Sequence, residues 1–386
     1  MVNHRDTDES SKRIADKGVM SMIEPVDDSR LIRIGVFGTG GAGCNAINHM
    51  IDARLAHVEF YAVNTDLQAL AMSSAANKIQ IGAQLTGGLG SGGDPAIGRQ
   101  AAEESIETIR EQVTGLDMVF IAAGMGGGTG TGAAPVIAEA AREQGALVVA
   151  VVTRPFDFEG RARMGKAQEG VQALRSRVDT LIVLPNQRVL EVHGQEPCFE
   201  AFRMADEVLL NAVRGIADIV TSRQLINIDF ADVRAVMAER GGAVMAVGQA
   251  DGAGRATEAA NLALSSPLIE SVSIETARKV LLNVSGDEKM TLREVDEAAQ
   301  VVSHATNGQA DIRMGAARPR DLQSGIKVTV IATGLNEPLP TLDDVSDLLT
   351  DATLFPHRRR ELDGEGRAVL KKNDLEVPTF LRRSLD

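Results

Sequence analysis

Two glycine-rich segments constrain the fold of this chain more than any other feature. The first, Gly38–Gly43 (GTGGAG), ends the apolar run Leu31–Gly38, and the second, Gly124–Gly132 (GMGGGTGTG), follows the apolar run Asp117–Ala123. Glycine this dense is entropically costly in a folded chain, so it indicates that something must approach the backbone closely. A turn from a strand into a helix directs free backbone N–H groups toward an anion. Both segments therefore predict phosphate binding.

The first segment matches GxGxxG, which is weak evidence when it stands alone. It is also compatible with a tight strand-to-helix turn, or with a nicotinamide-dependent enzyme in which Asp66 would bind the ribose. The second segment offers consecutive amides and two hydroxyls, a concave set of donors suited to a polyphosphate. A nicotinamide enzyme does not need this second set, and the chain has no GxxxxGK[ST] motif, which excludes a P-loop protein.

The order of the remaining elements predicts an α/β fold with a mainly parallel sheet, covered by helices on both faces. Ligands of such sheets bind at the carboxyl ends of the strands, where all the glycine loops are expected to lie. A long amphipathic helix is expected over 198–221, before a smaller α/β unit. The expected strands are Leu31–Gly38, Val58–Val63, Asp117–Ala123, Ala146–Thr153, Thr180–Leu184, Ala243–Gly248, Lys279–Ser285, Gln309–Met314 and Lys327–Ala332. The other expected helices are Asn45–Leu55, Pro95–Val113, Ala133–Gln144 and Gly160–Arg175, and Gly82–Asp94 is expected to form an irregular loop.

Composition excludes several classes of protein. The 386 residues carry a formal net charge of -13 and only 3% aromatic residues, which argues against binding nucleic acid. The two cysteines, Cys44 and Cys198, lie far apart without a metal-ligand spacing, as expected in a reducing cytosol. Residues 1–30 are polar, and no apolar run is long enough to span a bilayer. Direct membrane insertion is therefore not expected.

The segment Gly126–Gly132 (GGGTGTG), between a strand and a helix, is the signature that the chain shares with the tubulin/FtsZ family. The similarity covers residues 31–335 almost continuously and resumes at Asp374–Arg383. It implies a Rossmann-like parallel-sheet GTPase domain, a long central helix and a smaller α/β C-terminal domain. The implied boundaries are an N-terminal arm at 1–30, a GTP-binding domain at 31–197, the central helix and its connecting loop at 198–226, a C-terminal domain at 227–334, a linker at 335–372 and a terminal peptide at 373–386.

The resemblance also implies the contacts of GTP or GDP and an accompanying Mg²⁺, with no side chain assigned to the metal. Asn64 and Thr65 correspond to the loop near the γ-phosphate, Glu159 and Arg163 to ribose- and phosphate-side contacts, and Phe202 and Asp206 to the residues that hold guanine. A carboxylate suits guanine, because it accepts from N1–H and the exocyclic amine. The residues assigned to the two glycine loops are Gly41, Ala42, Gly43, Cys44, Asn45, Gly128, Thr129 and Gly130.

Three of these residues either depart from the family pattern or have an alternative interpretation. Ala42 and Cys44 stand where many relatives have glycine; Ala42 is small enough for the backbone to come close. Cys44 is either an oxidisable thiol beside the nucleotide or, the interpretation we favour, an inert small residue. For Asp206, the sequence alone favours a solvated helix position.

The segment Asn227–Asp232 (NIDFAD) resembles the acidic loop with which this family enters the nucleotide pocket of the neighbouring subunit. The resemblance makes Asn227, Asp229 and Asp232 catalytic, with the two carboxylates orienting the attacking water. The same residues are compatible with helix capping, in which Asp229 is the N-cap before Val233 and Val236. Both roles can hold together. Head-to-tail stacking of subunits would then complete each hydrolytic site and generate an open filament.

The terminal segment Asp374–Arg383 (DLEVPTFLRR) regains apolar residues after a Pro-, Asp- and Arg-rich stretch. It is typical of a short binding peptide on a tether, although a terminus without any role is the alternative. The resemblance implies docking on membrane-tethering division proteins, and hence a cytoplasmic protein at the mid-cell division ring. A nucleotide-binding paralogue that does not polymerise remains a second hypothesis, which the intact Asp229 and Asp232 disfavour.

Overall fold

The computed structural model describes residues 32–193, 197–221, 224–239, 241–266, 274–318, 322 and 324–335. A few side chains within these ranges, including those of Cys198 and Phe202, are also outside the description. The described residues form an eleven-stranded sheet in the order β3-β2-β1-β4-β5-β6-β8-β11-β9-β10-β7. The strands are β1 (Ile34–Thr39), β2 (Glu59–Asn64), β3 (Asn77–Gln80), β4 (Met118–Gly124), β5 (Leu147–Arg154), β6 (Thr180–Pro185), β7 (Gln224–Ile226), β8 (Gly242–Ala250), β9 (Lys279–Gly286), β10 (Asp311–Ala317) and β11 (Ile326–Leu335).

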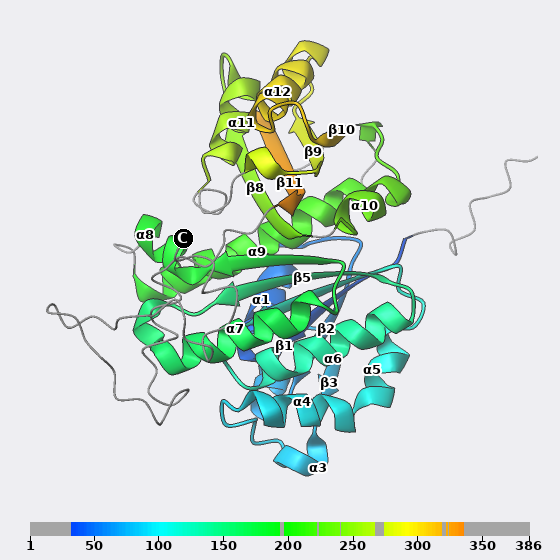
Figure 1. Ribbon diagram of the computed structural model, residues 1–386, viewed down its shortest axis with the longest axis vertical. Coiled ribbons are helices and arrows are strands. Elements are labelled where there is room, and N and C mark those ends of the chain that lie inside the picture. Colours follow the sequence, from blue (N-terminus) through cyan, green and yellow to red (C-terminus); the bar gives the residue numbers. More distant parts are fainter. Residues whose placement is uncertain are drawn as a thin grey trace, which may run out of the picture. The chain divides into compact units, whose positions relative to one another are not determined.

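The first six strands are all parallel to their neighbours, and β1, β4 and β5 are buried on both faces, as the sequence predicts. Successive residues of β1 enter different cores: Val36 packs on the α1 and α9 side, and Phe37 on the side of α4 to α7 (Figure 1). Both faces thus need apolar residues, which explains the nearly continuous apolar runs. The helices are α1 (Gly40–Asp52), α2 (Leu67–Met72), α3 (Ala83–Thr86), α4 (Pro95–Glu104), α5 (Ile106–Val113), α6 (Thr129–Glu143), α7 (Arg161–Arg175), α8 (Asn186–His193), α9 (Cys198–Thr221), α10 (Phe230–Met237), α11 (Arg255–Leu264) and α12 (Leu292–Ala305).

The long helix α9 has the bounds that the sequence predicts and lies between the two parts of the sheet (Figure 1). Leu209, Val213 and Ile216 repeat at helical spacing and are at most 1% exposed. They share one apolar core with strands of the parallel part and with Met245 and Leu281 of the second part. The helix therefore stabilises both parts at once.

The second part is a smaller α/β unit, as predicted. Strand β11 is antiparallel to both β8 and β9, while β9 and β10 are parallel. Helices α11 and α12 contribute to the core on one side of these strands. Strand β11 runs to Leu335, one residue into the range expected for the linker.

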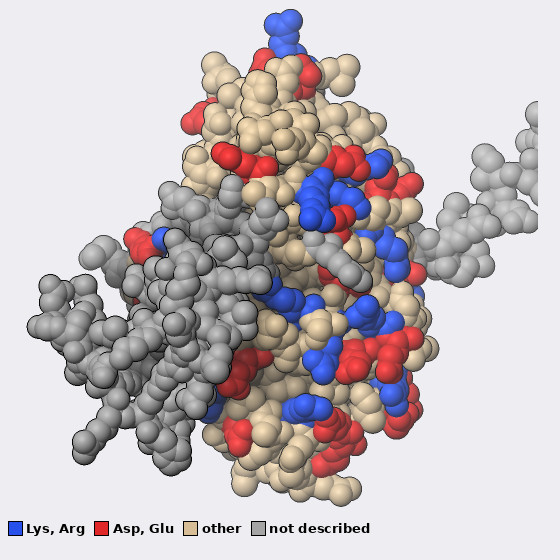
Figure 2. Space-filling view, viewed as in Figure 1, with Lys and Arg blue, Asp and Glu red and all other residues tan. Residues whose placement is uncertain are grey.

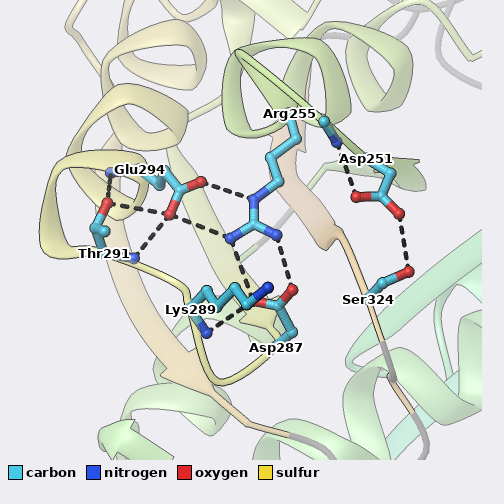
Figure 3. A network of polar contacts seen from close by, with 8 residues as sticks. Asp251, Arg255, Asp287, Lys289, Thr291, Glu294 and Ser324 are labelled. Carbon is cyan, nitrogen blue, oxygen red and sulfur yellow. Dashed lines mark hydrogen bonds and ion pairs between the residues drawn. The ribbon is translucent and has the colours of Figure 1, made fainter.

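A cluster of charged and polar residues surrounds Arg255 in this unit (Figure 3). The Arg255 side chain, 10% exposed, donates from Nη1 to Asp287 at 2.9 Å and from Nε to Glu294 at 2.7 Å. These hydrogen bonds lower the pKa of both carboxyl groups. Asp251 accepts from Ser324 Oγ at 2.8 Å, which joins the end of β8 to the segment before β11. The cluster thus ties α11, α12 and the segments between the strands together.

Three predicted elements have different bounds in the structure. The predicted helix Pro95–Val113 is divided at Ser105, which ends α4 and begins α5 while its Oγ accepts from Gly82 N. The predicted irregular loop Gly82–Asp94 contains the short helix α3, which is flanked by Gly82 and Gly87 at φ of 63° and 58°. The helix expected from Asn45 begins at Gly40 instead. The sequence predicts no element at α2, β3, β7 or α8, which are too short to show a clear period, and it predicts the second α/β unit without placing α11 and α12.

Candidate functional site

Two helices begin side by side at the carboxyl ends of neighbouring parallel strands. Strand β1 leads into α1 at Gly40, and β4 leads through the second glycine loop into α6 at Thr129. Gly40 has a φ of 72°, and a Cβ added there would lie 2.8 Å from Gly130 N. Only glycine allows this approach. The first amides of both helices lack partners within their helices, so the two N-termini together suit an anion.

The loop glycines fall into two groups with different roles. A Cβ added at Gly41 or Gly127 would meet no atom within 4 Å, so the backbone at these positions is open to a ligand. At Gly43, Gly128 and Gly130 an added Cβ would overlap neighbouring backbone. The first group suits close approach of a phosphate, and the second allows the loops to pack against each other. Ala42 and Asn45 are exposed on the same turn of α1 as Gly41.

A cluster of buried hydroxyl groups lies beneath the second loop. Thr129 Oγ1 is 2.7 Å from Thr65 Oγ1 and 3.0 Å from Ser91 Oγ, which joins α6 to the segments after β2 and β3. Thr39 Oγ1, at the end of β1, is buried and has no hydrogen-bond partner among the described residues. A buried polar group without a partner is costly, so a ligand oxygen near the loops would satisfy Thr39. The donor set thus fits a polyphosphate.

Asn64 and Cys44 are buried next to this cluster. Asn64 Oδ1 accepts from Thr65 N at 2.9 Å and so fixes the backbone turn at the end of β2. The Cys44 thiol faces Gly38 O at 3.5 Å, and burial raises its pKa to about 11. Since the thiolate is the reactive form, the interpretation of Cys44 as an inert small residue agrees with its surroundings.

The start of α7 comes close to the second glycine loop. Glu159 accepts from Phe156 N at 2.9 Å and pairs with Arg163 at 2.8 Å. Arg163 keeps 52% of its side chain exposed, whereas Glu159 is 17% exposed. A Cβ added at Gly126 would lie 2.7 Å from Arg163 O, which shows how closely the two segments approach. Both expected site residues therefore lie beside the loop.

Asp206 lies on α9 and is half-buried, unlike the solvated position that the sequence alone favours. Burial raises its pKa to about 6. Such a carboxyl group gains from a ligand that donates hydrogen bonds to its ionised form. The side chain of Phe202, one turn earlier, lies outside the described residues.

The acidic segment 227–232 is at the opposite edge of the parallel strands from the glycine loops. Asp229 is the N-cap of α10, with Oδ1 accepting from Asp232 N at 2.7 Å, as the capping interpretation predicts. Further along α10, Arg234 donates to Gly145 O at 3.4 Å, and Met237 O accepts from Thr180 Oγ1. Gly145 and Thr180 stand at the amino ends of β5 and β6, whereas the glycine loops follow carboxyl ends. Figure 1 shows α10 on the side away from α8, which follows the carboxyl end of β6.

This separation can be estimated from strand length. Strand β5 has eight residues, and at about 3.3 Å per residue its two ends are about 26 Å apart. A side chain at the amino edge does not reach a ligand at the carboxyl edge of the same chain. Asn227 and Asp229 are exposed, and Asp232 is partly exposed. The three acidic-loop residues therefore face outward, away from their own glycine loops.

A separate groove of about 470 Å³ lies between α4, α5, α6 and α7. Its arginines have carboxylate partners close by: Arg99 with Glu103, Arg110 with Glu143, and Arg177 with Glu139. Figure 2 shows basic and acidic side chains interspersed on the face in view. The arginines of the groove are therefore paired with carboxylates within the protein, and the Lys166 ammonium donates to Gly93 O at 2.6 Å, so these cations already have partners.

Sequence patterns missed three residues that the structure associates with these segments. Ser91 lies in a glycine-rich stretch that gives no helical or strand period, and Thr39 lies within the first glycine segment, whose pattern assigns no role to its side chain. Arg313, on β10, pairs with Asp232 at 3.3 Å although the two residues are far apart in the sequence. For Ser91 and Thr39, a hydroxyl group within a glycine-rich loop is a sequence signal for a site residue. No local pattern in the sequence indicates Arg313.

Comparisons with known proteins identify the family. The model of the GTPase domain of the Tubulin/FtsZ family matches residues 33–194, and that of the C-terminal domain of the FtsZ family matches residues 241–336. A solved FtsZ dimer from M. jannaschii is 44% identical, with 80% of this chain and 89% of that chain covered and a TM-score of 0.75. CetZ2 from Haloferax volcanii, solved as a GTPgS-bound protofilament, shares the fold at 20% identity, with 84% and 98% covered and a TM-score of 0.68.

The chain belongs to the tubulin/FtsZ family of GTPases, whose members are GTP-binding, tubulin-like proteins of the cytoskeleton. Its second domain is of the FtsZ type, which associates it with cell division. The nicotinamide alternative is therefore wrong, and the Asp66 carboxylate instead caps α2 by accepting from Gln68 N and Ala69 N. Within the described part of the chain, no helix is both long and apolar enough to cross a membrane.

Proposed function

We propose that this protein binds GTP at its glycine loops and hydrolyses it only when a second copy supplies Asp229 and Asp232. Subunits then stack head to tail, and the resulting filament forms the cell-division ring in the cytoplasm. The observation that carries the proposal is the position of the two half-sites at opposite edges of one sheet. A contact between unlike faces of identical subunits generates an open filament when its rotation does not close into a ring.

The nucleotide contacts follow from the chemistry of each segment. The amides at the starts of α1 and α6, from Gly41 to Asn45 and from Gly128 to Gly130, would hold the phosphates. Asn64 and Thr65 lie near the γ-phosphate, and Arg163 and Glu159 on the phosphate and ribose sides. Asp206 accepts from guanine, against which Phe202 stacks.

Magnesium ion would accompany the triphosphate. Among the described residues no group of three His, Cys, Asp or Glu side chains is arranged to hold a metal ion. Mg²⁺ commonly takes most of its ligands from phosphate oxygens and water, so the phosphates of the bound GTP would supply its oxygen ligands together with water. When bound, the ion neutralises charge on the phosphates.

Hydrolysis needs an oriented water and stabilisation of negative charge. Asp229 and Asp232 of the neighbouring subunit accept hydrogen bonds from the water, which attacks the γ-phosphorus. The bond to the β–γ bridging oxygen breaks, and the protons of the water leave with the released phosphate, so the products are GDP and phosphate. Asn227 assists in placing the water. Loss of the γ-phosphate then weakens the contact between subunits.

The proposed domain boundaries are those implied by the family resemblance, from the arm at 1–30 to the peptide at 373–386. The linker 335–372 lies outside the described residues apart from Leu335, and the segment Asp374–Arg383 lies wholly outside them. We propose that this segment docks on membrane-tethering division proteins. Its apolar residues and the charge of Arg382 and Arg383 support this role.

Mixing two inactive variants tests whether hydrolysis occurs between chains. Asp229→Ala removes the acidic half, and Thr129→Arg blocks the nucleotide half. In an equimolar mixture about a quarter of the head-to-tail contacts would pair two intact halves. We expect phosphate release to recover toward about a quarter of the wild-type rate.

The matched control mixes Asp229→Ala with Asp232→Ala, which lack the same half and should show no recovery. Wild-type specific activity should also rise with protein concentration, together with light scattering after addition of GTP. Turnover that is independent of protein concentration would contradict the proposal, and would favour a paralogue that does not polymerise.

A further inference from the structure

Arg313 forms a two-way ion pair next to the acidic loop. It lies on β10, and its guanidinium contacts Asp232 Oδ1 at 3.3 Å through Nη1 and Asp311 Oδ2 at 3.1 Å through Nη2. Among the described residues it is the cation paired with Asp232. One carboxylate thus belongs to the same strand as the arginine, and the other belongs to the first turn of α10.

The strand explains why Arg313 points toward α10. Side chains alternate between the two faces of a strand. Ile312 and Met314 pack on the core beneath α11 and α12, so Arg313 and Asp311 project from the other face. Strand β7 pairs with β10 at Ala316 and Ala317, beyond Arg313, and from there the chain continues into the acidic loop.

The two acids of the loop are fixed by different means. Asp229 is held by its own cap, through the 2.7 Å hydrogen bond from Asp232 N. Asp232 follows in the first turn, where 35% of its side chain is exposed, and the contact that restrains its carboxylate is the one from Arg313. A guanidinium is planar and rigid, and when Asp311 holds one end of it the other end has a defined direction.

We propose that Arg313 is a positioning residue for hydrolysis, which holds the Asp232 carboxylate in the orientation that it needs toward the water in the neighbouring subunit. This inference rests on the proposed function of Asp232. A small displacement of a group that orients a reactant can cost up to about a hundredfold in rate. By contrast, an exposed ion pair contributes little to stability. The two possible roles of Arg313 therefore differ in what its removal changes.

The test compares Arg313→Ala and Arg313→Lys with the wild type, using the full-length protein. Phosphate release is measured at saturating GTP and at protein concentrations far above the assembly threshold. The threshold is measured by sedimentation, and folding by thermal unfolding. We expect Arg313→Ala to lower kcat about tenfold, with the assembly threshold, the affinity for GTP and the melting temperature close to the wild-type values. Arg313→Lys keeps the charge but loses the fork, and should have an intermediate kcat.

Arg278→Ala is the matched control. Arg278 is also an exposed arginine, 66% exposed, and pairs at 3.6 Å with Glu239, just beyond α10. This variant should keep the wild-type kcat. A loss in Arg278→Ala equal to that in Arg313→Ala would show a general effect of surface charge, and would overturn the inference.

A double-mutant cycle separates this inference from the proposed function. If Arg313 acts through Asp232, adding Arg313→Ala to Asp232→Ala should cause no further loss of kcat. A further tenfold loss would mean that Arg313 acts independently, which overturns the positioning role, as would a wild-type kcat in Arg313→Ala alone. A wild-type rate in Asp232→Ala would instead overturn the proposed function, and the inference with it.

Discussion

The buried hydroxyl cluster predicts that Thr129→Val destabilises the protein even without nucleotide. Thr129 Oγ1 bridges Thr65 at 2.7 Å and Ser91 at 3.0 Å, and the three side chains are 8%, 0% and 6% exposed. Valine has nearly the same shape as threonine but offers no hydroxyl group. The substitution therefore removes two hydrogen bonds, leaves their partners buried, and changes the packing little.

The size of the effect follows from these contacts. A neutral hydrogen bond contributes about 0.5–1.5 kcal/mol to the free energy of unfolding. When its loss leaves a buried polar group without a partner, the cost is near or above the upper end of this range. Two such bonds give a loss of about 2–3 kcal/mol in the free energy of unfolding. For a domain of this size that corresponds to a fall of about 5 °C in melting temperature. If Thr129 also donates to a phosphate, GTP affinity should fall by at least about tenfold.

The assay is thermal unfolding of nucleotide-free protein, followed by titration with a fluorescent GTP analogue. Thr129→Ser is the control, because it keeps the hydroxyl and should lose only about 1 kcal/mol for the deleted methyl group. Equal melting temperatures for Thr129→Val and Thr129→Ser would refute the bridging role of the hydroxyl. A lower melting temperature with unchanged GTP affinity would refute only its contact with phosphate.

Asp206, the glycines at the start of α1 and Arg255 can each be tested by substitution. Since burial raises the pKa of Asp206 to about 6, protonation should remove the hydrogen-bond acceptor for guanine and lower GTP affinity by about tenfold per pH unit below that value. In binding titrations from pH 5 to 8, Asp206→Asn should abolish this dependence. In the nucleotide-free protein the effect on stability is the opposite, because the folded state holds the proton more tightly than the unfolded state, so the free energy of unfolding should increase as pH falls from 6 toward 4. Gly41→Ala should keep the wild-type melting temperature but weaken GTP binding, because its Cβ enters open space. Gly40→Ala should lower the free energy of unfolding by roughly 1–2 kcal/mol, owing to its φ of 72°. Arg255 lowers the pKa of Asp287 and Glu294, so its contribution to stability is present above roughly pH 4–5, where these groups titrate in the unfolded chain, and is lost as the pH falls below that range. Denaturant unfolding should show that Arg255→Met is less stable than the wild type at pH 7. The difference between the two proteins should become small in acid.

Local sequence determined the elements whose cause is local. The density of glycine in Gly124–Gly132 has few explanations other than close backbone approach, and the loop occurs between β4 and α6 as expected. The apolar spacing of Leu209, Val213 and Ile216 gave the bounds of α9 and its buried side. The capping role of Asp229 was also readable, because an N-cap acts on amides only three residues away.

Tertiary structure decided everything that depends on residues distant in the chain. A period shows which side of a helix is buried but not what covers it, so Asp206 read as solvated although its surroundings raise its pKa. Thr129 finds hydroxyl partners 64 and 38 residues away, and Arg313 finds a carboxylate on another element. The position of α10 at the amino edge of the strands depends on its contacts with Gly145 and Thr180. No local pattern encodes that separation, because it arises only when the two parts of the sheet pack around α9.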